Sequence, residues 1–373
     1  MQTDTRTAKA PAPEQGSRKE EIMEVFEAMR VHEHEQVLFS WEPSVGYKGI
    51  IAIHNTMLGP ALGGTRFWNY RSEHEALTDV LRLSRGMTYK AAVAGLNLGG
   101  GKSVIIGDPK TRRREMIFRA HGRFVDSLKG RYITAEDVGT SVEDMSYVQM
   151  ETEFVAGVAG GSGDPSPITA YGTYCGIKAC AHERYGDDGL EGRRIAVQGL
   201  GHVGFHLCEY LAAEGATLIV TDIDESKVRQ AVTELRVTAV APEEIYGVDA
   251  QIFAPCALGA VVNDRTLPQF RFEIIAGAAN NQLDQERHGD RLEEREILYA
   301  PDYVINAGGL INVYGELSGW TPDRAKRKAA EIYETLIQLF EIARDQGLPT
   351  YKAADRLAER RIHQVSQLKR TWI

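Results

Sequence analysis

The stretch RRIAVQGLGHVGFHLCEYLAAEGATLIVTDIDESK, residues 193–227, decides which fold this sequence predicts. Its apolar run at 195–198 is typical of a β-strand and is followed by three glycines in the spacing GxGxxG. A helical pattern then continues to about Glu214, and a second apolar run ends at Asp222. The order of strand, glycine turn, helix and strand predicts a βαβ unit with two parallel strands.

The glycine turn of this unit indicates a dinucleotide-binding site. GxGxxG alone is weak evidence, but here it lies between a strand and a helix, and Asp222 ends the next strand 18 residues after Gly204. Glycines let a pyrophosphate approach the backbone at the helix N-terminus. Asp222 would bind the ribose hydroxyls of the adenosine and repel a 2′-phosphate, which favours NAD over NADP. Asp224 could share that role, and Lys227 leaves NADP as an alternative cofactor.

The second half of the chain continues the alternation of strands and helices. Three further apolar segments are expected to extend a doubly wound sheet, at 249–257, 273–280 and 297–301. The 3.6-residue periodicity then predicts three helices, at 305–317, at 321–346 as one long amphipathic helix, and at 350–364.

The first half also reads as an α/β domain. Strands are expected at 35–41, 47–55 and 131–137. Helices are expected from residue 20, at 72–90 behind Ser72 as the N-cap, at 116–128, and from Ser141, which with Asp144 forms a weak capping box. The segment GGSGDPSPITAYG, residues 160–172, is dense in Gly, Pro and Ser and predicts a linker. We therefore expect a hinge near this segment.

The composition describes a globular chain of 373 residues, 43% hydrophobic, which is enough for about two domains. A net charge of −9 without a basic face argues against nucleic acid and anionic membranes as partners. There is neither an apolar stretch of about 18 residues nor a secretion signal, so a cytoplasmic location is expected. The four cysteines form no CxxC pair and are expected to be reduced thiols.

A second glycine-rich stretch, GLNLGGGKSVIIGDP at residues 95–109, places three glycines directly before Lys102. A phosphate-binding P-loop needs four residues between its first glycine and the Gly-Lys pair, whereas five separate Gly95 from Gly101. Residues 103–106 predict a strand where a P-loop would begin a helix. The stretch is therefore either a glycine turn with a solvated lysine or a bare backbone that lets a substrate reach Lys102.

Long motifs in both halves of the chain resemble one enzyme family. They are LGPALGGTRFWNY (58–70), EALTDVLRLSRGMTYKAAVAGLNLGGGKSVIIGDP (75–109), RYITAEDVGTSVEDM (131–145), DPSPITAYG (164–172), VQGLGHVG (197–204), AQIFAPCALGA (250–260) and APDYVINAGGLINV (300–313). From about Glu20 onward the chain resembles the leucine dehydrogenase branch of the Glu/Leu/Phe/Val dehydrogenases. Several of these motifs are long and ungapped, so chance does not explain the match.

The resemblance implies reversible, NAD-dependent oxidative deamination of an L-amino acid in a cleft between two domains. It implies that Lys102 polarises the substrate carbonyl and activates water, and that Lys90 binds the α-carboxylate. Asp137 would exchange protons with the amino group or ammonia, and Asn281 would reach the carboxylate from the nucleotide-binding domain. The glycines before Lys102 would then provide clearance for the substrate and the nicotinamide.

Elementary chemistry agrees with two lysines in different roles. A substrate carboxylate needs a cation, and the oxygen that develops charge on the reacting carbon is stabilised by a second cation in a water-poor cleft. A buried lysine beside another cation has its pKa lowered toward the working pH. The simpler alternatives are that Lys90 is a charge at a helix C-terminus and that Asp137 is a loop or cap residue.

The resemblance also implies a side-chain pocket, lined around Leu62, Gly63, Gly64, Met87, Ala135, Leu310 and Val313. Ala135 resembles the leucine-type enzymes, whereas Leu310 resembles the aromatic-specific ones, and Asn280 departs from the leucine-type pattern. We expect branched-chain substrates, leucine first, with the same reaction on phenylalanine or tryptophan as the alternative. No charged residue is among the expected pocket positions, which argues against glutamate.

The cofactor-binding residues expected from the glycine motif and the resemblance are Gly199, Leu200, Gly201, His202, Val203, Gly204, Asp222, Thr169, Asn280 and Asn306. No metal is expected, because His32 and His34 of VHEHE lack partners at usable spacing and are better explained as a solvated helix end. The alternative from another functional class is a non-catalytic sensor that binds NAD. It would not need Lys90, Lys102 and Asp137 together.

The expected architecture is α/β, with two domains, an intervening cleft and a Rossmann-type doubly wound second domain. Residues 1–19 are expected to be a disordered leader. Residues 20–155 with 350–373 are expected to form a substrate-binding and oligomerisation domain, and 156–349 the NAD-binding domain. The expected partners are the amino acid, the 2-oxo acid, ammonia and further copies of the chain, from dimer to octamer.

Overall fold

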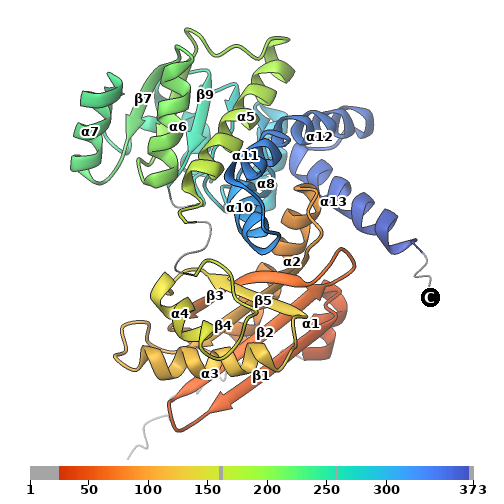
Figure 1. Ribbon diagram of the computed structural model, residues 1–373. Helices are drawn as coiled ribbons and strands as arrows, with labels where there is room; N and C mark the ends of the chain where they lie inside the picture. The colour runs from red at the N-terminus through yellow and green to blue at the C-terminus, as the bar shows by residue number, and fades with distance from the viewer. Residues whose placement is uncertain (1–24, 159–162, 258, 369–373) are drawn as a thin grey trace, which may run out of the picture.

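The computed structural model describes residues 25–158, 163–257 and 259–368 (Figure 1). The expected leader at 1–19 and the helix start at residue 20 lie outside these residues. Figure 1 shows two units, each built around one β-sheet, with part of α2 (Glu73–Val93) and of α10 (Gly308–Leu317) in the region between them. The two-domain α/β architecture expected from the sequence is confirmed.

The first unit is a mixed five-stranded sheet in the order β1-β2-β4-β3-β5. Its strands are β1 (Gln36–Glu42), β2 (Tyr47–Asn55), β3 (Ala61–Trp68), β4 (Gly99–Ile106) and β5 (Tyr132–Glu136). Its helices, besides α2, are α1 (Val25–His32), α3 (Arg114–Asp126) and α4 (Val142–Gln149). β3 pairs in parallel with both β4 and β5, so the carboxyl ends of these three strands lie at one edge of the sheet.

Helix α2 forms where the sequence predicts it. The Ser72 side chain accepts a hydrogen bond from the Glu75 backbone N–H and caps the first turn. Ala76, Leu77 and Val80 then repeat on one helix face and are buried with β2 and β4. The capping box of Ser141 at the start of α4 is also present. The burial of its face orients α2 so that its last turn reaches the second unit.

The second unit is a parallel six-stranded sheet in the order β11-β10-β9-β6-β7-β8. Its strands are β6 (Arg194–Gln198), β7 (Thr217–Thr221), β8 (Thr238–Ala239), β9 (Ile252–Pro255), β10 (Ile274–Ile275) and β11 (Leu298–Tyr299). Its helical segments, besides α10, are α5 (Ser166–Tyr185), α6 (His202–Ala213), α7 (Glu225–Leu235), η1 (Ile245–Gly247), η2 (Leu267–Gln269), α8 (Glu286–Glu294), α9 (Asp302–Ile305), α11 (Pro322–Ala330) and α12 (Ile332–Gln346). The strand order reverses between β6 and β9, which is the doubly wound arrangement of a Rossmann-type domain.

The single long helix predicted at 321–346 is wrong, because two helices, α11 and α12, meet at Glu331. The Glu331 N–H bonds the carbonyl of Lys328, three residues back, which tightens the chain into one turn of 3₁₀ type. Buried Ala329 before this turn and Ile332 after it both pack near Gly172 of α5. The amphipathic pattern runs through the break because both helices bury the same side.

The last helix, α13 (Thr350–Ser366), packs against both α2 and α12 and therefore touches both units. The apolar end of α2, including Ala92 and Leu96 beyond it, shares a hydrophobic core with α5 and with α9 to α13. The proposed grouping of 350–373 with the first domain accordingly stays a prediction. None of the helices in the described ranges is long and apolar enough to cross a membrane.

Candidate active site

A pocket of about 380 Å³ lies between the two units and brings together residues from distant parts of the chain. Among the residues expected from the sequence, it is lined by Leu62, Gly64, Met87, Lys90, Lys102, Ala135, Asp137, Asn280, Asn281, Leu310 and Val313. The first unit contributes β3, α2, β4 and β5, and the second contributes α10 and the loop before α8. The arrangement follows from the parallel strands, whose carboxyl ends open toward the second unit.

Lys102 and Asp137 form an ion pair in this pocket, with 3.1 Å between Nζ and Oδ2. Lys102, on β4, is only 5% exposed, and Asp137 follows directly after β5. Burial lowers the pKa of Lys102 and outweighs the opposing charge of Asp137. Burial raises the pKa of Asp137, but the charges of Lys102 and Arg66 outweigh it and hold that pKa below its ordinary value. The carboxylate form of Asp137 is therefore stabilised at neutral pH.

Lys90 lies in the last turn of α2 and faces the second unit across the pocket. Burial lowers its pKa to about 8; the negative charge of Asp302 opposes this change, and the positive charge of Lys102 adds to it. Asp302, on α9, accepts a hydrogen bond from the Gln282 backbone N–H at 2.9 Å, and burial raises its pKa. The two lysines thus have different surroundings, as different chemical roles require.

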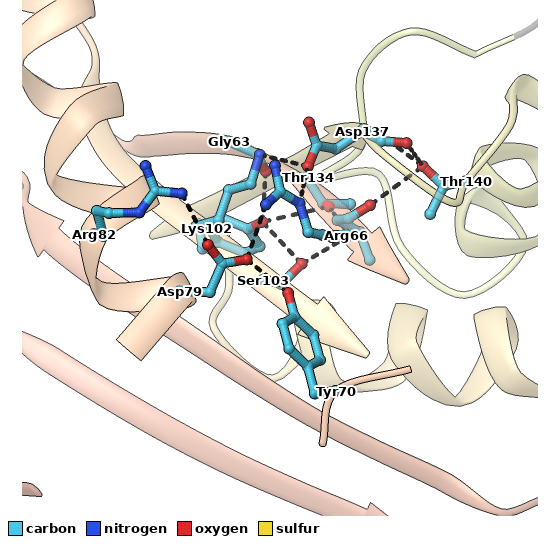
Figure 2. Close-up of polar contacts among 12 residues, drawn as sticks. Gly63, Arg66, Tyr70, Asp79, Arg82, Lys102, Ser103, Thr134, Asp137 and Thr140 are labelled. Carbon is cyan, nitrogen blue, oxygen red and sulfur yellow. Dashed lines mark hydrogen bonds and ion pairs between the residues drawn. The ribbon is translucent and has the colours of Figure 1, made fainter. Parts of the chain in front are cut away.

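Asp302 and Arg66 are polar pocket residues that the sequence analysis missed. Arg66 donates to Asp137 and to Asp79 of α2, as Figure 2 shows. The motif LGPALGGTRFWNY contained a signal for Arg66. Leu62, Gly64 and Arg66 occupy alternate positions of β3, so their side chains share one face of the strand. Asp302 stands in APDYVINAGGLINV, but nothing in its local pattern places it opposite Lys90.

The glycines before Lys102 serve packing more than substrate clearance, which corrects the interpretation made from the sequence. Gly99, Gly100 and Gly101 belong to strand β4. A Cβ at Gly100 would lie 2.1 Å from the Thr88 backbone nitrogen, and one at Gly101 would lie 2.7 Å from the Tyr132 ring. These residues therefore let α2 and Tyr132 of β5 pack closely around β4.

Two of the expected pocket glycines have similar surroundings. A Cβ at Gly63 would lie 1.8 Å from the Gly101 carbonyl oxygen, so Gly63 faces β4. A Cβ at Gly64 would lie 2.9 Å from the Asp137 Cβ, so a side chain there would displace Asp137. Gly64 lines the pocket together with Leu62, whereas Gly63 brings β3 and β4 together behind it.

A second pocket, of about 330 Å³, lies at the carboxyl ends of β6 and β7 and is lined by Gly199 and Asp222 among others. Gly199 has a left-handed φ of +98°, and a Cβ at Gly204 would lie 2.0 Å from the Gly199 carbonyl oxygen. At Gly201 a Cβ would meet no atom within 4 Å, so the backbone before α6 faces open space. These are the three separate roles that glycines have in a dinucleotide-binding turn.

Of the remaining expected cofactor residues, only Asn280 lines one of these two pockets. Leu200 donates its backbone N–H to Asp222 Oδ2 at 2.6 Å, and Asp224 caps α7 by accepting from the Ser226 N–H, so Asp224 has a structural role. Asn306 is buried and donates to Asn280 Oδ1 at 2.7 Å. The others are His202 and Val203, which begin α6, and Thr169, which lies beside Gly309.

His34 contradicts the interpretation of VHEHE as a solvated helix end. It is buried, its Nε2 lies 2.7 Å from Ser84 Oγ, and its ring is 4.8 Å from that of His54. Burial lowers the pKa of His34 to about 4, so the ring is neutral. Among the described residues, no group of three or more His, Cys, Asp or Glu side chains could hold a metal ion.

The fold and the site together define an amino acid dehydrogenase. Residues 32–154 match the family model "Glu/Leu/Phe/Val dehydrogenase, dimerisation domain", and residues 220–370 match "Glutamate/Leucine/Phenylalanine/Valine dehydrogenase". The chain belongs to the Glu/Leu/Phe/Val dehydrogenase family, as the sequence motifs predict.

Several characterised relatives cover nearly the whole chain. It is 56% identical over 354 residues to the leucine dehydrogenase of Bacillus cereus, covering 94% of this chain and 97% of the relative. It is 49% identical over 348 residues to an L-tryptophan dehydrogenase of Nostoc punctiforme, covering 93% and 98%. The crystal structure of L-tryptophan dehydrogenase from Nostoc punctiforme matches with a TM-score of 0.85 at 48% identity, covering 92% and 100%.

Proposed function

We propose that this chain catalyses the reversible oxidative deamination of a branched-chain L-amino acid, leucine first. The amino acid, NAD⁺ and water give the 2-oxo acid, ammonium, NADH and a proton. One observation carries the proposal: Lys90, Lys102 and Asp137 meet in one pocket whose remaining walls include apolar Leu62 and Val313. The 56% identity to leucine dehydrogenases supports it.

In the proposed mechanism Lys90 and Asn281 bind the substrate carboxylate from opposite sides of the cleft. Asp137 accepts a proton from the substrate ammonium group, which leaves an amine whose Cα can lose a hydride. The chemistry that NAD would supply when bound is acceptance of this hydride, so that the substrate becomes an iminium ion. Lys102, with its pKa lowered by burial, takes a proton from the water that adds to the iminium carbon. Asp137 then returns its proton to the nitrogen, and ammonia leaves while the hydroxyl proton passes to solvent and Lys102 stabilises the oxygen.

The second pocket fits a dinucleotide, because the open space at Gly201 leaves room for a pyrophosphate at the start of α6. Gly199, Gly201 and Asp222 would hold it, and the Asp222 carboxylate favours NAD over NADP. Arg265 lines the same pocket and is a cation that the sequence analysis missed. Since Asp222 already accepts two backbone N–H groups, its carboxylate is held in place to meet ribose hydroxyls.

The same reaction on phenylalanine or tryptophan is the second candidate, which the 49% identity to a tryptophan dehydrogenase favours. Leu310 is the residue expected in an enzyme for aromatic substrates, whereas Ala135 is the residue expected in an enzyme for leucine. One methylene in a pocket is worth about 1 to 3 kcal/mol of discrimination, so the two residues act on substrate preference with comparable strength. We keep leucine as the proposed substrate because the identity to leucine dehydrogenases is higher.

NADH-coupled reductive amination across aliphatic and aromatic 2-oxo acids tests the proposal. The expected result is the highest kcat/KM with 4-methyl-2-oxopentanoate. A higher value with phenylpyruvate or indolepyruvate would replace leucine by an aromatic substrate. NAD binding without turnover of any substrate would favour the sensor, although a sensor has no need of Lys90, Lys102 and Asp137 together.

We also propose a homo-oligomer, from dimer to octamer, in which residues 20–155 with 350–373 provide the contacts and residues 156–349 bind the cofactor. The description of the matching family model as a dimerisation domain supports contacts through residues 32–154. A cytoplasmic location remains the proposal from the sequence. Light scattering during size-exclusion chromatography tests the oligomeric state.

A further inference from the structure

Arg66 joins two carboxylates that lie on different elements of the first unit. Its Nε is 3.0 Å from Asp137 Oδ2, and its Nη1 is 2.9 Å from Asp79 Oδ2. Its side chain is 20% exposed, so both contacts are largely shielded from solvent. The planar guanidinium directs donors toward two acceptors at once, which a single ammonium group does less well.

Asp79 is itself held from two further directions. The Tyr70 hydroxyl donates to its Oδ2 at 2.8 Å, and Arg82 Nη2 donates to its Oδ1 at 3.0 Å (Figure 2). Because α2 is packed along the sheet, Asp79 is a rigid anchor for Arg66. The position of the guanidinium is therefore determined by α2 as well as by β3.

The two cations that contact Asp137 meet the same oxygen atom. Lys102 Nζ and Arg66 Nε both approach Oδ2, as Figure 2 shows. Within the described part of the chain, Oδ1 has no hydrogen-bond partner. The Asp137 backbone N–H donates to Thr140 Oγ1 at 2.8 Å, which holds the main chain of this residue as well. Asp137 thus presents one restrained oxygen and one oxygen that is available to a ligand in the pocket.

We propose that Arg66 is a positioning residue for the reaction: it holds Asp137 as a carboxylate with Oδ1 directed at the substrate nitrogen, while Asp79 anchors Arg66. The inference rests on the proposed function, because it needs Asp137 to exchange a proton with that nitrogen. Arg66 acts through Asp137 and takes no part in proton transfer itself.

The charges around Asp137 make the inference testable through the pH profile. The charged and titratable groups that interact with Asp137 or Lys102 or line the pocket with them are Arg66, Tyr70, Asp79, Arg82, Lys90, Lys102, Tyr132, Glu136 and Asp302. Arg66 lowers the pKa of both Asp137 and Lys102, whereas Asp79 raises that of Lys102. Loss of Arg66 and loss of Asp79 should therefore move the pH profile in opposite directions.

The experiment measures kcat/KM for oxidative deamination of leucine against pH in the unmodified chain and in Arg66→Gln, Arg66→Lys and Asp79→Asn. We expect Arg66→Gln to lower kcat about 10- to 100-fold and to move the acid limb to higher pH by roughly half a unit or more. In Arg66→Lys the acid limb should return to the pH of the unmodified chain, whereas kcat should recover only in part. In Asp79→Asn the acid limb should move to lower pH. The KM for NAD should not change.

Arg123→Gln is the matched control, because Arg123 is a surface arginine on α3 that pairs with Glu151. If kcat/KM of Arg66→Gln falls by the same factor at every pH, Arg66 only stabilises the strand and the inference is overturned. If Arg66→Gln does not fold, the acid limbs of Arg66→Lys and Asp79→Asn test the inference: the first should be unshifted and the second should lie at lower pH. An unmodified chain without turnover would overturn the proposed function as well, whereas turnover with an unshifted limb in the variants overturns the inference alone.

Discussion

Lys102 Nζ lies 3.1 Å from Asp137 Oδ2, although Lys102 is on β4, Asp137 directly follows β5, and these two strands are not neighbours in the sheet. β3 lies between β4 and β5, and the glycines at Gly63 and Gly101 allow the three strands to pack closely enough for the pair to meet in front of β3. The pair therefore depends on tertiary packing as much as on the two residues themselves.

Lys102→Ala should abolish deamination while cofactor binding is retained. The variant removes the group that activates water, and loss of general acid-base catalysis costs about 10²- to 10⁴-fold in kcat. Turnover and NAD affinity, the latter by calorimetry, are the two measurements. Lys129→Ala is the control, since Lys129 lies beyond the end of α3 and its side chain is 74% exposed. Full turnover in Lys102→Ala would remove the catalytic assignment.

Binding of a substrate-like carboxylate should weaken above about pH 8. Lys90 binds a carboxylate only when protonated, and burial lowers its pKa to about 8. The affinity should be constant below that pH and fall about tenfold per unit above it, until Lys90 is fully neutral. The dissociation constant of 4-methylpentanoate, measured from pH 7 to 10, checks this. A flat profile in the unmodified chain, or the same slope in Lys90→Met, would show that another group binds the carboxylate.

Ala135→Gly should shift substrate preference toward aromatic 2-oxo acids. Ala135 lines the pocket and is 9% exposed, so its methyl group limits the space there. We expect the kcat/KM ratio of phenylpyruvate to 4-methyl-2-oxopentanoate to rise about tenfold. Ala239→Gly, at an exposed strand position in β8, should leave the ratio unchanged. An unchanged ratio in Ala135→Gly would place the end of the substrate side chain elsewhere in the pocket.

Gly101→Ala should destabilise the fold by about 1 to 3 kcal/mol, because its Cβ would overlap the Tyr132 ring. Urea denaturation measures the change in free energy of unfolding. Gly201→Ala has open space at its Cβ and should keep the stability while weakening NAD binding. If Gly101→Ala unfolds like the unmodified chain but loses substrate binding, the clearance interpretation was right after all.

Asp222→Ala should lower NAD affinity about 10- to 100-fold, the usual range for hydrogen bonds to a charged group, and reduce the preference over NADP. Asp224→Asn should leave the preference unchanged, because Asp224 caps α7. Competition binding with NAD and NADP gives both values. Equal effects from the two variants would mean that Asp224 shares the ribose contact.

Local pattern predicted most elements, since period, caps and glycine turns act over a few residues. The Ser72 and Ser141 caps and the strand before Gly199 formed where expected. The break at Glu331 was not predicted because the amphipathic pattern continues through it. His34 was misjudged because its buried surroundings come from Ser84 and His54, which are distant in sequence.

The sequence by itself determined the Rossmann-type unit and the family, because GxGxxG, the apolar runs and the long motifs are continuous stretches of chain. Only the tertiary structure decided that Arg66 and Asp79 support Asp137, that Asp302 faces Lys90, and that the three glycines serve strand packing. The physical reason is that a charge or a missing Cβ acts on whatever lies within a few ångströms, and those neighbours come from other strands and helices.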